Sequence, residues 1–147
     1  MNSDLSNKTR PVTILLVDDD DGDAKSVQRA FISARIINPL VRAHDGIDAL
    51  DILRGTNGKP RLSSPNLLLV DINMPRMNGI EFVEALRQDV ELHRSVVFML
   101  TTSDRDEDKI ASYDLNVAGY ILKEHVGECF HNLVELMQGY WRIVELP

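Results

Sequence analysis

The sequence has 147 residues, of which 44% are hydrophobic and 27% are charged. This length predicts a single domain without a second effector domain, and the apolar residues are too many for a disordered chain and too dispersed for a membrane span. The net charge of -7, with no cluster of Lys and Arg residues, argues against a protein that binds nucleic acid.

The first ten residues are polar and lack the apolar core of a signal peptide, so we expect a flexible tail at 1–10 and a cytoplasmic protein. Short runs of aliphatic and β-branched residues then predict five buried strands. These runs are Val12–Val17, Pro39–Ala43, Asn66–Val70, Ser95–Leu100 and Ala118–Leu122.

Between these strands, apolar residues recur at helical spacing. They predict helices around Val27–Ala34, Ala49–Leu53, Phe82–Leu86 and Ile110–Tyr113. Neighbouring parallel strands need crossover connections, so alternating strands and helices predict an α/β domain with a parallel sheet covered on both faces.

The last helix carries an apolar face that is wider than contact with one sheet surface requires. Apolar residues recur from Val126 to Trp141 and continue through the tail at 143–147, and Cys129 fits this pattern as a buried small hydrophobe. We predict a homodimer interface here, although neighbouring loops could instead cover a broad stripe. The predicted interface residues are Phe130, Leu133, Met137, Tyr140, Trp141 and Leu146.

Polar residues stand where the predicted strands end, which is where ligands bind in open α/β sheets. Clustered carboxylates repel one another unless a cation compensates, and Mg²⁺ prefers oxygen ligands and often bridges a carboxylate and a phosphate. A lysine and a threonine hydroxyl can contact phosphoryl oxygens. The pattern therefore predicts a phosphoaspartate site built from Asp18, Asp19, Asp71, Asn73 (through its backbone carbonyl), Thr101 or Thr102, and Lys123.

Each of these residues has an ordinary interpretation when it is taken alone. An Asp at a strand end most often forms a turn or caps a helix, and we interpret Asp20, Asp21 and Asp23 in that way. A single Lys is usually solvated, and the four histidines share no spacing that suits metal binding. Only the joint occurrence of the motifs, each at a strand end, makes the site prediction specific.

These motifs resemble the receiver domain of two-component response regulators over essentially the whole chain. The matching segments are Leu15–Asp20, Leu67–Gly79, Met99–Ser103 and Gly119–Lys123. The resemblance implies a flavodoxin-like, doubly wound (βα)5 sandwich with a five-stranded parallel sheet of order 2-1-3-4-5. It also implies a receiver domain at 11–142.

The same resemblance implies a role for each site residue. Asp71 is the expected phosphoacceptor, and Asp18, Asp19, Asp71 and the carbonyl of Asn73 are the expected ligands of Mg²⁺, which Mn²⁺ can replace. Thr101 and Lys123 are expected to contact the phosphoryl group, and Tyr120 resembles the aromatic residue that switches with phosphorylation. The proline that usually follows the lysine is Glu124 here, which leaves the geometry of that loop open.

A narrower resemblance is to stand-alone regulators paired with bacterial phytochromes, carried by Ala111–Lys123, the Thr101–Ser103 triplet and the ending after Tyr140. It implies a bacteriophytochrome histidine kinase as partner and dimerisation through the last helix, with no nucleic-acid or membrane partner.

The alternative function is a degenerate receiver that binds partners without phosphorylation. An enzyme of the aspartyl-phosphate hydrolase type would need a general acid where Asn73 stands, and no Gly-rich nucleotide motif follows the first strand. We therefore expect no enzymatic activity beyond the chain's own phosphorylation and dephosphorylation.

Overall fold

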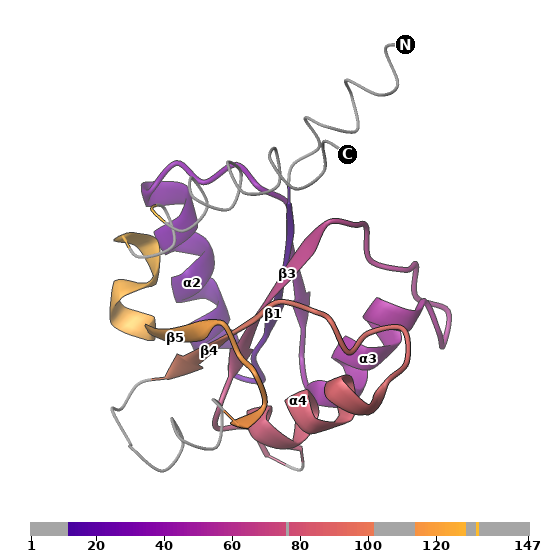
Figure 1. The fold of residues 1–147 in the computed structure, drawn as a ribbon. Coiled ribbons are helices and arrows are strands. Elements are labelled where there is room, and N and C mark those ends of the chain that lie inside the picture. Colours follow the sequence, from indigo (N-terminus) through magenta and orange to yellow (C-terminus); the bar gives the residue numbers. More distant parts are fainter. Residues whose placement is uncertain (1–11, 76, 102–113, 129–131, 133–147) are drawn as a thin grey trace, which may run out of the picture.

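The structure, a computed structural model, describes residues 12–75, 77–101, 114–128 and 132 (Figure 1). Its strands are β1 (Thr13–Val17), β2 (Leu40–Ala43), β3 (Asn66–Asp71), β4 (Val97–Thr101) and β5 (Gly119–Leu122). Its helices are α2 (Asp21–Ser33), α3 (Gly46–Arg54), α4 (Gly79–Gln88) and the short 3-10 helix η1 (Lys123–His125). None of the helices among the described residues is long and apolar enough to cross a membrane.

The five strands form one parallel sheet in the order β2-β1-β3-β4-β5, which confirms the predicted fold. The observed strands begin and end within two residues of the predicted ones. Three of the expected helices correspond to α2, α3 and α4. The helix expected around Ile110–Tyr113 lies outside the described residues, as does the last helix apart from residues 126–128 and 132.

Alternate residues of the strands face opposite sides of the sheet, as the period of a β-strand requires. Leu15 and Leu68 pack with α3 and α4 in one core, whereas Ile14 and Leu67 pack with α2 in the other. Figure 1 shows the same division, with α2 on one side of the sheet and α3 and α4 on the other. Because both faces are covered, the central strands are apolar along almost their whole length.

The helices α2, α3 and α4 each begin at a side-chain cap that follows the preceding strand. Asp20, Asp45 and Asn78 accept hydrogen bonds from the backbone N–H groups three residues later. Asn78 and Glu81 form a reciprocal capping box. These caps place the positive ends of three helices at the edge of the sheet where the strands end.

Candidate functional site

Four of the predicted site residues meet at the carboxyl edge of the sheet. Asp18 directly follows β1, Asp71 ends β3, Thr101 ends β4, and Lys123 directly follows β5. Parallel strands deliver these residues to the same edge, so residues distant in the sequence become neighbours. Asp18, Asp71 and Thr101 are buried.

Three carboxylates form a compact cluster at this edge. Asp18 is fully buried, Asp71 is 5% exposed, and Asp19 lies at the surface. One carboxylate oxygen from each residue lies within 4.8 Å of the others. The backbone N–H of Asp20 donates to Oδ1 of Asp18 at 3.0 Å, and that of Asn73 approaches Oδ1 of Asp71 at 3.4 Å. The cluster therefore presents oxygen atoms of the kind that hard divalent cations bind.

Oδ2 of Asp18 gives an independent indication of a cation site. It is buried and accepts no hydrogen bond, although Nζ of Lys123 lies 3.1 Å away as an ion-pair partner. A buried carboxylate oxygen without a hydrogen bond is costly unless a cation compensates for the lost water. The single charge of Lys123 compensates for only part of the negative charge of the three carboxylates, so the donor set and this oxygen together also fit a divalent metal ion.

Lys123 brings a positive charge into the cluster. Its Nζ lies 3.3 Å from Oδ2 of Asp71 and 2.7 Å from Oδ2 of Asp23, in addition to its contact with Asp18. Its side chain is only 11% exposed. Burial alone would lower the pKa of Lys123, but the hydrogen bond to Asp23 and the charges of Asp71 and Asp18 raise it above its usual range. Lys123 therefore remains an ammonium at neutral pH.

Burial raises the pKa of Asp71 to about 6. The ammonium of Lys123 opposes this rise, and the charge of Asp18 adds to it. Perturbed carboxyl groups in such clusters are typical of functional sites. Asp71 therefore combines a position at the end of a central strand with the electrostatics of a reactive group.

Asp23 adjoins this cluster through Lys123, so the interpretation of Asp23 as only a helix-start residue is incomplete. Asp20 is the cap of α2, and its side chain accepts the N–H of Asp23, whose own carboxylate reaches Lys123. Asp23 precedes the buried Val27 by four residues, so both lie on one side of the helix. This spacing places Asp23 on the apolar side of α2, but it does not by itself indicate the contact with Lys123.

The remaining predicted residues are placed as follows. Tyr120 is half-buried in β5 and packs against the core on the α3 and α4 side. Asn73 is exposed two residues after Asp71. Thr102 and Ser103 lie outside the described residues, as do the six residues predicted at the dimer interface.

Residues Lys123–His125 form a turn of 3-10 helix, so Glu124 stands in a helical turn where the sequence comparison led us to expect a proline. Among the described residues the cis peptide bond precedes Pro65, and the bond between Lys123 and Glu124 is trans. With Glu124 in place of the proline, Lys123 still lies beside Asp18 and Asp71.

Two residues outside the cluster fix its backbone. Arg42 donates to the carbonyl oxygen of Asp18 from Nε at 3.2 Å and from Nη2 at 2.9 Å, while its Nη1 pairs with Asp21 at 2.6 Å. Gly79 donates its N–H to the carbonyl of Ile72, and a Cβ at Gly79 would collide with the carbonyl of Asp71. A side chain at position 79 would therefore displace the end of β3.

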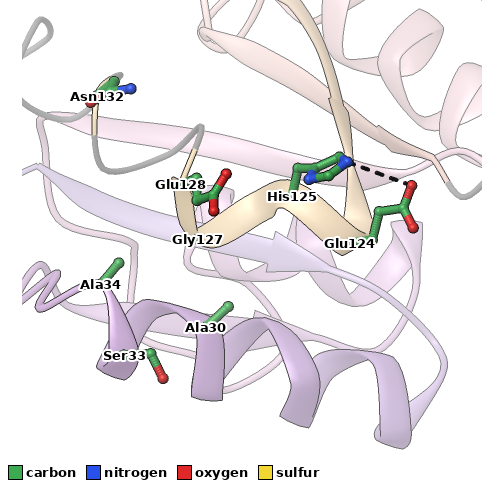
Figure 2. A pocket seen from close by; sticks show the side chains of 8 residues that line it. All are labelled: Ala30, Ser33, Ala34, Glu124, His125, Gly127, Glu128 and Asn132. Atoms are coloured by element: carbon green, nitrogen blue, oxygen red, sulfur yellow. Dashed lines mark ion pairs between the residues drawn. The ribbon is translucent and has the colours of Figure 1, made fainter.

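A groove of about 660 Å³ lies elsewhere on the molecule, between the C-terminal half of α2 and the residues after β5. Figure 2 shows Ala30 of α2 and Ala34, the residue that ends this helix, facing the segment that carries His125. Nε2 of His125 lies 3.7 Å from a carboxylate oxygen of Glu124. The groove contains none of the clustered carboxylates, which lie near the opposite end of α2.

Comparison with known families and structures agrees with this arrangement. The model of the response regulator receiver domain matches residues 14–135. Response regulator Rcp1 of Synechocystis is 34% identical over 146 residues, which cover 99% of this chain and 98% of Rcp1. The two sequences therefore match over nearly their whole lengths.

Solved structures give the same result. A two-component response regulator from Legionella pneumophila has a TM-score of 0.76 and 34% identity, covering 88% of this chain and 98% of its own. The Mn²⁺-bound form of Rcp1 has a TM-score of 0.67 and 34% identity, covering 89% of this chain and 94% of its own. The phosphorylated cyanobacterial phytochrome response regulator RcpA has a TM-score of 0.71 and 30% identity, also covering 89% and 94%.

Proposed function

The chain belongs to the response-regulator receiver family of two-component phosphorelays, and on this premise we propose that Asp71 accepts a phosphoryl group from a histidine kinase. The observation that carries this assignment is the contact of Asp71 with Lys123 inside the carboxylate cluster. Among the clustered carboxylates, Asp71 combines a raised pKa with a position at the end of a central strand.

In the proposed step, a carboxylate oxygen of Asp71 forms a bond to phosphorus as the phosphorus–nitrogen bond of a phosphohistidine breaks. The electron pair returns to the imidazole nitrogen, which then takes up a proton. Lys123 neutralises charge on the transferring phosphoryl group, and the hydroxyl of Thr101 donates a hydrogen bond to one of its oxygens. The side chains of this chain thus supply orientation and electrostatic stabilisation.

We propose Mg²⁺ as the metal, with Mn²⁺ able to replace it, held by Asp18, Asp19, Asp71 and the backbone carbonyl of Asn73. The oxygen donors and the unsatisfied Oδ2 of Asp18 support this choice, as does the Mn²⁺-bound form of the related Rcp1. When bound, the ion offsets negative charge on the carboxylates and the phosphoryl group.

Phosphorylation is proposed to act through Thr101 and Tyr120. A phosphoryl group adds nearly two negative charges, which would draw the Thr101 hydroxyl toward it and let Tyr120 repack against the space left behind. We propose no turnover of an external substrate, so the chain's chemistry is confined to its own phosphorylation and dephosphorylation.

The proposed partner is a sensor histidine kinase of the bacteriophytochrome type in the cytoplasm. The phytochrome response regulator RcpA supports this partner, because it resembles the chain over most of its length. We also propose a homodimer formed by the last helix and tail, without a nucleic-acid or membrane partner. Replacement of Trp141 by Ala should then shift the sedimentation coefficient toward that of the monomer.

Phosphoryl transfer from a purified, phosphorylated bacteriophytochrome kinase tests the proposed function. We expect the label to move to the wild-type chain when Mg²⁺ is present and to remain on the kinase when a chelator is added. A histidine kinase of another sensory class serves as the control for partner choice. No transfer from either kinase would contradict the proposal and favour the phosphorylation-independent receiver.

A further inference from the structure

The ammonium of Lys123 contacts the carboxylates of Asp18, Asp23 and Asp71, but at unequal distances. Oδ2 of Asp23 lies 2.7 Å from Nζ and accepts a hydrogen bond from it. Oδ2 of Asp18 and Oδ2 of Asp71 lie farther away, at 3.1 and 3.3 Å, and that of Asp18 accepts no hydrogen bond. Nζ of Lys123 therefore donates its hydrogen bond to Asp23, which is not one of the three clustered carboxylates Asp18, Asp19 and Asp71.

The three acids also differ in exposure. The side chain of Asp23 is 46% exposed, whereas those of Asp18 and Asp71 are 0% and 7% exposed. A half-exposed carboxylate that loses its ion pair is solvated by water at little cost. A buried carboxylate has no such replacement and requires a cation. Asp23 is therefore the partner that Lys123 can leave most easily.

The packing of α2 against the segment after β5 maintains this contact. The cap at Asp20 fixes the first turn of α2, which carries Asp23. A Cβ at Gly127 would lie 3.1 Å from the carbonyl oxygen of Ala30, so the chain after η1 approaches α2 closely. Asp23 and Lys123 are thus held together by two elements that pack directly against each other.

We propose that Asp23 is a positioning residue that draws the Lys123 ammonium away from the metal-binding carboxylates in the unphosphorylated state and releases it when Asp71 is phosphorylated. Lys123 and a metal ion compete for Asp18 and Asp71, so a carboxylate that holds Lys123 favours metal binding. A phosphoryl group on Asp71 also needs Lys123, so the same carboxylate disfavours the phosphorylated state. This inference rests on the proposed function of Asp71.

The test compares Asp23→Asn with Asp21→Asn, which removes the same charge from the same turn of α2. Asp21 pairs with Arg42 and serves as the matched control. Calorimetric titration with Mg²⁺ should give a dissociation constant about fivefold higher for Asp23→Asn than for Asp21→Asn, the effect of a partly exposed charge-assisted contact. At saturating Mg²⁺, phosphoaspartate formed from acetyl phosphate should decay more slowly in Asp23→Asn.

The opposite direction of the two effects distinguishes positioning from a structural role. If Asp23→Asn only disturbs the structure of the site, Mg²⁺ should bind more weakly and the phosphoaspartate should decay faster. That result would overturn the inference. Equal Mg²⁺ affinities for the two variants would overturn it as well. If the wild type takes no label, the proposed function fails, while the Mg²⁺ comparison still decides whether Asp23 controls Lys123.

Discussion

The ammonium nitrogen of Lys123 lies 3.3 Å from Oδ2 of Asp71, although Asp71 ends β3 and Lys123 follows β5. Both side chains are almost completely buried, and the fully buried Asp18 contacts the same ammonium. The buried charges are therefore interdependent, and the loss of any one of them changes the environment of the others. Four predictions follow from this arrangement and from the packing that supports it.

Replacement of Lys123 by Ala should destabilise the metal-free protein by about 3 kcal/mol, because two buried carboxylates lose their counter-charge. Mg²⁺ should restore part of this loss, since it can compensate for the same carboxylates. Urea unfolding with and without Mg²⁺ measures both effects. Lys59→Ala, which breaks a partly exposed pair with Asp48, serves as the control and should cost less than about 1 kcal/mol. Equal stability of Lys123→Ala and wild type without metal would contradict the prediction.

Replacement of Asp71 by Asn should stabilise the metal-free protein at neutral pH. Burial raises the pKa of Asp71 in the folded chain to about 6 from its ordinary 3.8. Its contribution to stability is therefore fully present below pH 3.8 and is lost as the pH rises through about 6. Asn carries no charge at any pH and avoids this loss.

The stability difference between the Asp71→Asn variant and the wild type should reach at most about 3 kcal/mol above that pKa and shrink as the pH falls. Chemical unfolding of both proteins over a range of pH, in the presence of a chelator, measures it. A difference that does not change with pH would show that the titration of Asp71 does not control the effect.

Mg²⁺ affinity should fall as the pH decreases through about 6, because a proton on Asp71 competes with the metal for the same oxygens. Each further unit of pH should then weaken binding by about tenfold if one proton is displaced. Calorimetry in two buffers with different ionisation enthalpies counts the displaced protons directly. Metal affinity that is unchanged across this range would contradict the assignment of Asp71 as a ligand.

Replacement of Gly79 by Ala should destabilise the fold by about 1–3 kcal/mol, because the added methyl group would collide with the carbonyl of Asp71. The displaced end of β3 should also reduce phosphoryl incorporation. Gly119→Ala is the control, since its Cβ would meet the ring of Phe98 only at an ordinary 3.4 Å. Gly79→Ala should have a lower melting temperature in thermal unfolding and should take up less label from acetyl phosphate than Gly119→Ala. Equal behaviour of the two variants would show that close packing at Gly79 is unimportant.

The sheet could be predicted from the sequence because buried parallel strands are nearly continuous apolar runs. The strand ends were less certain, since hydrogen bonding rather than hydrophobicity decides them. Asp71 illustrates this difference: its polar side chain marks the end of the apolar run, yet its backbone pairs with Leu100 and belongs to β3.

The meeting of Asp18, Asp71 and Lys123 could also be predicted, because the topology of a parallel sheet brings its strand ends together. The contact between Asp23 and Lys123 could not be derived in the same way, because it depends on how α2 packs against the segment after β5. The unsatisfied Oδ2 of Asp18 is likewise a property of side-chain positions that strand and helix patterns do not determine.

The most direct test of the central claim is to identify the residue that carries the phosphoryl group. The chain is incubated with acetyl phosphate and Mg²⁺, the acyl phosphate is reduced with borohydride, and the peptides are sequenced by mass spectrometry. We predict reduction of the acyl phosphate to an alcohol at Asp71 alone, and none when Mg²⁺ is chelated. Modification at another carboxylate, or none in the presence of Mg²⁺, would contradict the assignment of Asp71 as the phosphoacceptor.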